Sequence, residues 1–568
     1  MTREQKCFRV IFFCGKIWVT NFKGDGMSMK KRWVSLLLIV TMLATMLTAC
    51  DTKIKDEKSQ VTENVIEYDY YQELNVIDDN YRNYYEIFVY SYYDSDGDCI
   101  GDLQGVIEKL DYIEYMGFNG IWLMPIMPSP SYHKYDVVDY YAIDEVYGNM
   151  EDFEQLVEEC HKRGINVVID FVINHSSSEH PWFTAACEYL ATLEEGQEPD
   201  LSVCPYVDYY HFSKEKVAQT YYAVPGTKWY YEGAFWSGMP DLNLKSEAVR
   251  KEFEDIATFW IEKGVDGFRI DAAKHFEALV DDNNEILNWL YTKCTSLKSD
   301  FYMVSEVFDS YGTFSQYYGS KTPSIFNFDA GQQTGRLFKA AKGYMAASEY
   351  IDVLIAYDKK FSSYNENYID AVFLTNHDMG RVAEACVNNE NNMKMAAGLM
   401  MMMNGSPFVY YGEEIGMNST SDKDENKRLP MYWSDIVRAG TTDGPPDCNL
   451  GIESNFEAVD EQLKDGYSLL NYYRHAIRLR NENPEIARGE IKKIDSLCTD
   501  TYGVMTKTYE GSTIAIAINN KNEEVQITLT DSEIAEMKIR GYLTLQGEEI
   551  TLKDGVLTLP AKSICILK

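Results

Sequence analysis

Residues 166–175 read NVVIDFVINH, an apolar run that ends in the polar pair Asn174 and His175. Apolar residues at mostly consecutive positions, in place of alternate ones, are typical of a strand that is buried on both faces. Such strands belong to parallel sheets that helices cover on both sides. The stretch therefore predicts an α/β fold in which polar side chains gather where a buried strand ends.

Seven further runs of this kind occur along the chain, and amphipathic stretches such as residues 152–163 separate them. The seven runs are residues 87–92, 120–125, 267–272, 301–307, 324–328, 371–374 and 407–411. Eight buried strands that alternate with helices predict a (β/α)8 TIM barrel. We expect this catalytic barrel to span residues 78–485.

Two parts of the chain depart from this alternation. Residues 176–245 are too many for a simple connection and are rich in Tyr, Trp and Pro, so they predict an inserted lobe after the third strand. Beyond the barrel the pattern changes to short alternating runs, such as 513–518 and 525–529, with a turn signal at 553–555. Residues 486–568 are therefore expected to form a C-terminal antiparallel β-sandwich.

The composition limits the classes of function. With 45% hydrophobic and 25% charged residues, the chain is neither wholly disordered nor a polytopic membrane protein. A formal net charge of -36 argues against nucleic acid as a partner, because phosphate binding relies on Lys and Arg. The 12 cysteines are scattered without metal or redox spacing, so most are expected to be free thiols or small buried hydrophobes. We expect a monomer that binds a neutral ligand or a cation.

The N-terminal residues indicate export. Residues 29–50, MKKRWVSLLLIVTMLATMLTAC, combine a basic start with a short apolar run, as signal peptides do. An uncleaved membrane helix is the alternative, but the run is short for a bilayer span. The end of the run resembles a bacterial lipobox, which implies cleavage before Cys50 and lipidation of this residue.

This resemblance also predicts where the protein resides. Residues 1–49 would be removed as the signal peptide, and residues 50–77 would form a lipidated tether on the extracellular face of the bacterial cell membrane. Residues 1–26 precede a complete signal sequence, so we expect translation to start at Met27 or Met29.

Polar residues follow four of the expected strands, where a barrel carries its catalytic groups. The four segments are DFVINH at 170–175, GFRID at 267–271, EVF at 306–308 and NHD at 376–378. In this order they resemble the four signature regions of the α-amylase family of glycoside hydrolases, and the resemblance extends over almost the whole mature chain. One such segment alone would be a weak signal, whereas four in order at strand ends are specific.

The resemblance implies cleavage of glucosidic bonds with retention of configuration. Such cleavage needs one carboxylate that attacks the anomeric carbon and one acid that protonates the leaving oxygen, about 5 to 5.5 Å apart. Asp271 and Glu306 match the family's nucleophile and general acid/base. Arg269 would share a strand face with Asp271 and favour the ionised nucleophile, whereas Glu306 needs a raised pKa. A cluster of ion pairs that only stabilises the barrel is the alternative.

The third family carboxylate matches Asp378. The resemblance implies that Asp378 binds sugar hydroxyls and favours the distorted transition state, and that His175 and His377 donate hydrogen bonds to the same ring. For His175 the alternative is a core histidine whose hydrogen bonds are satisfied within the protein.

Two further segments are expected to bind the substrate. Residues 133–136, HKYD, resemble the family's HxYD segment, which assigns His133, Tyr135 and Asp136 to the substrate, with Tyr135 stacking on the sugar. A core tyrosine is the alternative there. Lys274 and His275 match the pair that holds the glucose on the leaving side of the cleaved bond.

Residues 94–102, DSDGDCIGD, place carboxylates at every second position around a glycine. Such a density of oxygen ligands suits Ca²⁺. The segment resembles the calcium loop of many α-amylase family members, whose ligands would match Asp94, Asp96, Asp98, the Ile100 carbonyl and Asp102. Cys99 stands where the family usually has Gly, which puts the local backbone in question. A solvated acidic turn is the alternative.

The preferred linkage is suggested by two positions. Residues 239–243, MPDLN, resemble a segment of a subgroup intermediate between oligo-1,6-glucosidases and neopullulanases, and this subgroup contains α-amylases. Ala272 stands where members specialised for α-1,6 bonds usually have Val. We therefore expect an α-amylase that hydrolyses α-1,4 bonds in starch or maltooligosaccharides. An α-glucosidase or a 4-α-glucanotransferase is the closest alternative, and the intact triad disfavours a noncatalytic lipoprotein that captures glucan.

Overall fold

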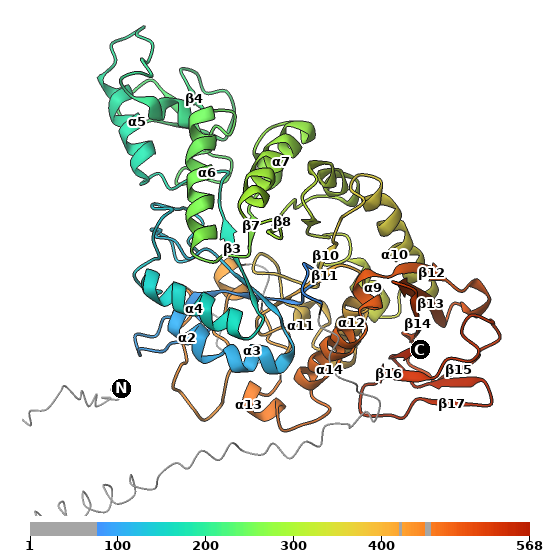
Figure 1. Cartoon of the computed structure of the whole chain (residues 1–568). Helices are drawn as coiled ribbons and strands as arrows, with labels where there is room; N and C mark the ends of the chain where they lie inside the picture. Colours follow the sequence, from blue (N-terminus) through green and yellow to red (C-terminus); the bar gives the residue numbers. More distant parts are fainter. Residues whose placement is uncertain (1–76, 420–422, 449–455) are drawn as a thin grey trace, which may run out of the picture. The chain divides into compact units, whose positions relative to one another are not determined.

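The central sheet consists of eight parallel strands in the order β10–β11–β1–β2–β3–β7–β8–β9 (Figure 1). Their bounds are Tyr84–Ile87 (β1), Gly120–Leu123 (β2), Asn166–Phe171 (β3), Gly267–Ile270 (β7), Tyr302–Ser305 (β8), Ser324–Ile325 (β9), Ala371–Phe373 (β10) and Ser406–Tyr410 (β11). A parallel bridge between Phe326 and Ala371 connects the segment after β9 to β10 and closes the sheet. The predicted (β/α)8 barrel is therefore confirmed.

The computed structural model describes residues 77–419, 423–448 and 456–568. The expected signal peptide, Cys50 and nearly all of the tether lie outside the described residues. Within the described ranges no helix is long and apolar enough to cross a membrane. The nine described cysteines are all free thiols, in agreement with the prediction.

Alternation along the strands decides which side chains enter the barrel. Phe171 of β3 stacks on Phe268 of β7 at 4.2 Å and meets Phe253 of a covering helix at 5.8 Å, so these rings face outward. Asp170 and Arg269, paired in register on the same two strands, therefore point inward. The interior of the barrel consequently receives charged groups from neighbouring strands.

The first strand differs from its prediction. It was expected at residues 87–92 but spans Tyr84–Ile87, while Val89–Ser91 form a 3-10 helix. Register pairing ends at Glu86 with β11 and at Ile87 with β2, so the chain leaves the sheet there. The tyrosines and the acid in the sequence YYEI concealed a strand that is buried at every position.

Helices cover the outside of the barrel. They comprise α2 (Leu103–Glu108), α3 (Leu110–Met116), α4 (Met150–Lys162), α6 (Glu247–Glu262), α7 (Val280–Leu297), α8 (Tyr311–Phe314), α9 (Arg336–Ala341), α10 (Ala347–Ser362), α11 (Val382–Ala385), α12 (Glu390–Met401), α13 (Val459–Gln462), α14 (Leu469–Glu482) and α15 (Glu485–Arg488). The helix expected at 152–163 is α4, which begins two residues earlier because Asn149 and Asp152 form a capping box.

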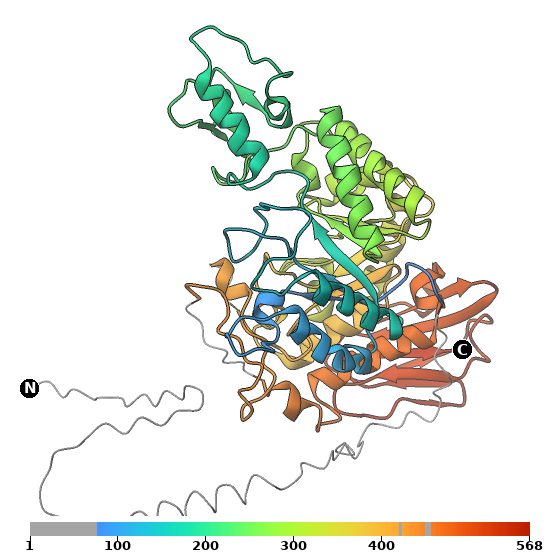
Figure 2. The same ribbon diagram turned by 60° about the vertical axis from the view of Figure 1, so that its left-hand side comes forward.

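The chain between β3 and α6 forms the predicted inserted lobe (Figure 2). It holds α5 (Pro181–Thr192), the 3-10 helix η2 (Pro205–Tyr209) and a small antiparallel sheet of β4 (Phe212–Ser213), β6 (Tyr230–Glu232) and β5 (Tyr221–Ala223). Ala186, Leu190, Cys204 and Val207 form a small core of its own. The lobe leads from the catalytic end of β3 back into α6, so it starts beside the expected site.

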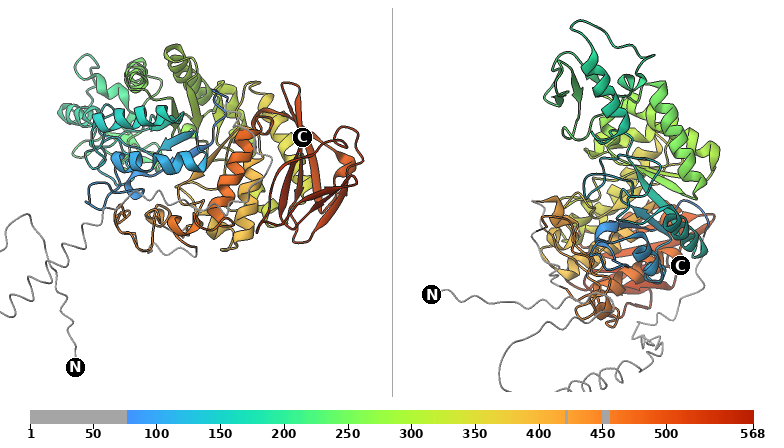
Figure 3. Two further views of the ribbon diagram at one scale, coloured as in Figure 1. Left: turned by 60° about the horizontal axis from the view of Figure 1, so that its bottom comes forward. Right: turned by 90° about the vertical axis from the view of Figure 1, so that its left-hand side faces the viewer.

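The C-terminal strands form two antiparallel sheets (Figure 3). One contains β12 (Glu490–Lys493), β13 (Tyr502–Tyr509), β14 (Ser512–Asn519), β19 (Ser563–Leu567) and β16 (Ile539–Leu543), and the other contains β15 (Val525–Thr528), β18 (Val556–Leu559) and β17 (Thr551–Lys553). Along β14, Ile514, Ile516 and Ile518 belong to the barrel core, whereas Ala515 and Ala517 belong to the core between the sheets. The predicted β-sandwich is thus present, and its first sheet also packs on the barrel.

Candidate active site

Two of the expected catalytic carboxylates follow adjacent strands of the barrel, and the third follows the strand beyond β9. Asp271 comes directly after β7, Glu306 directly after β8, and Asp378 a few residues after β10. Parallel strands end at the same edge of a sheet, so these side chains meet at the C-terminal mouth of the barrel. His175 lies at the same edge, beyond β3.

Arg269 connects the two carboxylates that the sequence assigns to catalysis. Its Nη1 atom lies 2.5 Å from Oδ1 of Asp271, and its Nη2 atom lies 3.2 Å from Oε2 of Glu306. The same guanidinium contacts Oδ1 of Asp170 at 3.0 Å. Arg269 is fully buried, so its charge is compensated by carboxylates and not by water. One buried cation therefore holds Asp271 and Glu306 on the same side of the barrel mouth, which we call one wall of the site.

The hydrogen bonds to Glu306 involve a single oxygen. The backbone amide of Ala272 donates to Oε2 at 3.0 Å, the same atom that Arg269 contacts. Among the described residues no donor reaches Oε1, so this oxygen is available to carry a proton. Burial raises the pKa of Glu306 above its ordinary value, although the charge of Arg269 opposes this shift. The environment therefore favours a protonated Glu306, as a general acid requires.

The opposite wall carries Asp378 between two cations. Arg428 donates from Nη2 to Oδ1 of Asp378 at 3.0 Å, and Nε2 of His377 lies 3.1 Å from Oδ2. Glu86 contacts Nδ1 of the same imidazole at 2.5 Å. Burial opposes the charged form of His377, but Asp378 and Glu86 prevail and raise its pKa to about 9. Partial desolvation opposes ionisation of Asp378, whose side chain is 45% exposed, yet His377 and Arg428 hold its pKa well below the ordinary value.

Tyr135 joins the two walls. Its hydroxyl donates to Oδ2 of Asp170 at 3.1 Å and lies 2.8 Å from Nε2 of His377. The ring is stacked on His377 with centroids 5.7 Å apart. The structure thus places Tyr135 between Asp170 and His377 in the barrel mouth.

His133 and Asp136 support the turn that carries Tyr135. Asp136 is buried and accepts hydrogen bonds from the hydroxyls of Ser129, at 2.7 Å, and Ser131. His133 lies 3.9 Å from Asp136, and burial, assisted by the charge of Arg428, lowers its pKa to about 4. Both residues are next to the site, but the bonds of Asp136 are made with the loop itself.

His175 and His275 flank an aromatic residue that the sequence did not single out. The ring of Phe235, from the lobe, lies 5.2 Å from each imidazole. Nε2 of His175 is buried and has no hydrogen-bond partner among the described residues, so it remains available for a ligand. Lys274 contacts the carbonyl of Phe308 at 2.9 Å, beside Glu306.

Sequence reasoning missed four residues of this site: Glu86, Asp170, Phe235 and Arg428. Asp170 and Glu86 were detectable in principle, because each is an acid within a buried strand. Arg428 lies in a segment without periodicity and reaches Asp378 across 50 positions of the sequence. No local pattern could identify it or Phe235.

The acidic loop after β1 brings together only part of its expected ligand set. Carboxylate oxygens of Asp94, Asp96 and Asp102 lie within 4.8 Å of one another, a spacing that suits oxygen ligands around one Ca²⁺. Asp98 is not part of this cluster, although it also accepts a backbone amide of the loop, that of Ile100 at 2.7 Å. Cys99 has φ 75°, the left-handed conformation that favours glycine, which explains why the family usually has Gly there.

Known proteins resemble this chain over most of its length. The family described as Alpha amylase, catalytic domain, matches residues 86–489. Alpha-amylase 3 of Dictyoglomus thermophilum is 37% identical over 456 residues, which cover 79% of this chain and 84% of that protein. Glucan 1,6-alpha-glucosidase of Streptococcus pneumoniae is 28% identical over 509 residues, which cover 78% and 92%.

A solved structure shares both the fold and much of the sequence. Eubacterium rectale Amy13B superposes with a TM-score of 0.84 at 46% identity, and the match covers 87% of this chain and 97% of that chain. The barrel, its strand-end carboxylates and these similarities lead to one assignment. The chain belongs to the α-amylase catalytic domain family and is a glycoside hydrolase of this family.

Proposed function

We propose that this chain is a retaining α-amylase that hydrolyses α-1,4 glucosidic bonds in starch or maltooligosaccharides. The observation that carries the proposal is the contact of one guanidinium, Arg269, with both Asp271 and Glu306. This contact keeps the two carboxylates close, and retaining glycosidases use carboxylates only about 5 to 5.5 Å apart.

In the first step, Oδ2 of Asp271 forms a bond to the anomeric carbon while the bond to the leaving oxygen breaks. Oδ1 of Asp271 is held by Arg269, which leaves the other oxygen as the nucleophile. The leaving oxygen takes the proton from Oε1 of Glu306. In the second step, Glu306 removes a proton from water, whose oxygen replaces Asp271 on the anomeric carbon.

Asp378 and the two histidines stabilise the sugar during both steps. Arg428 and His377 keep Asp378 ionised, so it accepts hydrogen bonds from sugar hydroxyls and favours the positively charged transition state. His175 donates from Nε2, its atom without a partner among the described residues.

The α-1,4 preference rests on Ala272 and on the amylases among the relatives. An α-glucosidase or a 4-α-glucanotransferase is the alternative, favoured by the match to a glucan 1,6-alpha-glucosidase. Timed product analysis of maltoheptaose separates the three. Short maltooligosaccharides from internal cuts support the amylase, glucose as the first product indicates an α-glucosidase, and products longer than heptaose indicate a transferase. NMR of the newly formed anomer tests retention.

We further propose Ca²⁺ as the ligand of the acidic loop, held by Asp94, Asp96 and Asp102. A bound ion would tie the start of α2 to the loop after β1, because Asp102 also accepts the amide of Gly105 at 2.7 Å as the N-cap of that helix. Its effect would be on stability, since the loop supplies no group to the reacting atoms.

Export and anchoring complete the proposal. The basic and apolar residues 29–49 and Cys50 support a lipoprotein at the extracellular face of the cell membrane. Metabolic labelling with a radioactive fatty acid is the test. Wild type should be labelled and sediment with membranes, and Cys50→Ala should be neither labelled nor sedimented. A label that survives in Cys50→Ala would contradict this assignment.

A further inference from the structure

Four charged groups alternate in sign along the wall of the site that carries Asp378. In order of contact they are Arg428, Asp378, His377 and Glu86. The proposed reaction uses the first three groups, whereas Glu86 lies behind them on β1 and takes no direct part in it. Glu86 can therefore act on the reaction only through His377.

The strand β1 directs Glu86 into the barrel. The preceding residue, Tyr85, stacks on Phe118, which follows α3 outside the sheet, so Glu86 points to the opposite side. Its side chain is 1% exposed, and its Oε1 atom lies 2.5 Å from Nδ1 of His377. Among the residues that the structure describes, no other group donates to this carboxylate. A buried carboxylate without a cation is costly, so Glu86 favours a charged His377.

Both nitrogens of the His377 ring face groups that accept hydrogen bonds. Nδ1 faces the Glu86 carboxylate, and Nε2 lies 3.1 Å from Oδ2 of Asp378. The hydroxyl of Tyr135, 2.8 Å from Nε2, already donates to Asp170, so it accepts at this nitrogen too. A neutral imidazole donates from one nitrogen only and would turn a lone pair toward a carboxylate. The contacts therefore require a doubly protonated ring.

The other charged groups around the ring do not replace Glu86. They are Arg428, Arg269, Asp170 and Asp378. The two arginines disfavour a charged imidazole, because they carry the same sign of charge. Asp170 is already paired with Arg269 at 3.0 Å. Asp378 favours the charged ring but is partly exposed, whereas Glu86 is buried, so water screens Glu86 less.

We propose that Glu86 is a positioning residue of the active site, because its carboxylate keeps a proton on Nδ1 of His377. The ring is then doubly protonated, and Nε2 donates toward Asp378 and the sugar that Asp378 binds. The proposal rests on the proposed function, because it assigns the effect of Glu86 to glycoside cleavage. It gives a catalytic consequence to β1, a strand that carries none of the three expected catalytic carboxylates.

The test measures kcat/KM on an α-glucosyl fluoride in the Glu306→Gln background, where Glu306 no longer titrates. Between about pH 6 and about pH 8 this value should stay level, because the pKa of His377 is raised to about 9. With Glu86→Gln added, kcat/KM should fall about tenfold over this range, because the pKa of His377 drops when one of its two carboxylates is lost. Glu86→Asp keeps the charge at a shorter reach and should restore part of the activity at the upper pH.

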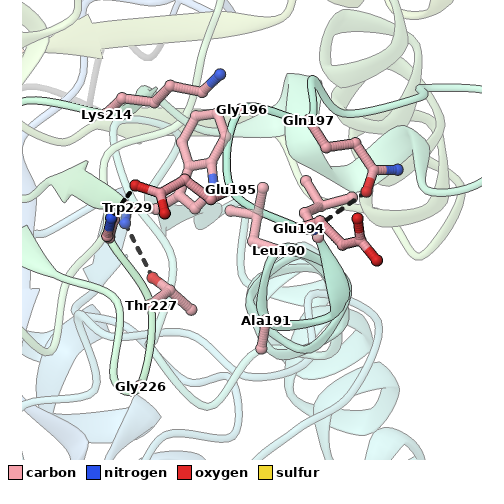
Figure 4. Close-up of a pocket in the computed structure, with 12 residues that line it drawn as sticks. Leu190, Ala191, Glu194, Glu195, Gly196, Gln197, Lys214, Gly226, Thr227 and Trp229 are labelled. Carbon is pink, nitrogen blue, oxygen red and sulfur yellow. Dashed lines mark hydrogen bonds and ion pairs between the residues drawn. The ribbon is translucent and has the colours of Figure 1, made fainter.

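Glu195→Gln is the matched control for the loss of one carboxylate. Glu195 lines a hollow of about 460 Å³ beside the end of α5 in the inserted lobe (Figure 4). Its side chain is 83% exposed and pairs with Lys228, and no residue of the catalytic site lines this hollow. The control should therefore leave the profile of kcat/KM against pH unchanged.

A profile that stays level in Glu86→Gln would overturn the proposal, because a neutral imidazole would then suffice. So would an equal loss at every pH, which would show that Glu86 only supports packing. NMR of histidines labelled with ¹⁵N reports the charge of the ring without turnover, and His377→Asn identifies the signal. At about pH 8 the ring should be charged in wild type and neutral in Glu86→Gln.

The two readouts separate this proposal from the proposed function. If wild type hydrolysed no maltooligosaccharide, the proposed function would fail, whereas the NMR comparison would still decide whether Glu86 controls the charge of His377. A ring that is charged in both proteins, or neutral in both, would show that Glu86 does not.

Discussion

The backbone amide of Ala272 donates a hydrogen bond to Oε2 of Glu306 over 3.0 Å. Ala272 directly follows the proposed nucleophile and has φ 49° and ψ 35°, the left-handed conformation. This conformation turns its amide toward the neighbouring strand. Ala272, on which the proposed linkage preference rests, therefore also orients the proposed acid/base, Glu306.

Replacement of Ala272 by Val should narrow the preference for α-1,4 over α-1,6 bonds. Wild type should hydrolyse maltotetraose much faster than isomaltotetraose, and one altered contact changes such discrimination by roughly 10- to 200-fold at most. The structure adds a cost, because a β-branched residue at positive φ is strained by about 1 to 3 kcal/mol. The measurement is kcat/KM on both tetrasaccharides, together with the Tm of each variant.

Ala272→Gly is the matched control for backbone strain. It keeps the amide and suits positive φ, so it should retain activity and Tm close to wild type. A wild type that prefers isomaltotetraose would contradict the α-amylase proposal, while the fold and the triad would stand.

Asp271→Asn should reduce kcat by many thousandfold with little change in Tm or in maltoheptaose affinity. The substitution removes the nucleophile at constant side-chain volume, and Arg269 keeps two carboxylate partners in Asp170 and Glu306. Residual activity above about one per cent of wild type would assign the nucleophile elsewhere.

Glu306→Gln should impair maltoheptaose far more than an α-glucosyl fluoride, whose leaving group needs little protonation. In wild type, kcat/KM on maltoheptaose should fall as pH rises through the pKa of Glu306. Burial raises this pKa, so the alkaline limb of the profile of kcat/KM against pH should lie above the ordinary titration range of a glutamate. The limb should be absent when Glu306→Gln acts on the fluoride. Equal losses on both substrates would argue against Glu306 as the acid.

The charge of His377 predicts how stability depends on pH. Its pKa is raised from 6.5 to about 9 in the folded state, so the stabilisation is fully present below pH 6.5 and is lost as pH rises through 9. The loss is at most about 3 kcal/mol. Glu86→Gln removes one of the two carboxylates that raise this pKa, so the fall in Tm between pH 6.5 and 9 should shrink. A fall as steep as in wild type would show that other groups cause it.

Chelation should test the calcium proposal and the ligand set together. EDTA should lower the Tm of wild type reversibly, because an ion bound only by the native loop stabilises by mass action. Asp96→Ala should abolish this sensitivity, since Asp96 belongs to the oxygen cluster. Asp98→Ala should retain most of it, since Asp98 lies outside that cluster. Unchanged melting of wild type after prolonged dialysis against EDTA would contradict a calcium site.

Seven of the eight barrel strands could be read from the sequence, because burial on both faces leaves a local signature of consecutive apolar residues. The same applies to Asp271, Glu306 and Asp378, which stand at the ends of such runs. Even the lobe was detectable, since 70 residues without barrel periodicity cannot form a short connection. In these cases the physical cause acts within about ten neighbouring residues.

Only the tertiary structure decided which groups tune those carboxylates. Glu86 reaches His377 across 291 positions, and Arg428 reaches Asp378 from a segment without a periodic pattern. The same holds for Oε1 of Glu306. This atom is left without a donor because the amide of Ala272, 34 residues earlier, and Arg269 both contact Oε2. Charge and hydrogen bonding depend on distances of a few ångströms in space, and distant segments reach such distances only when the barrel closes.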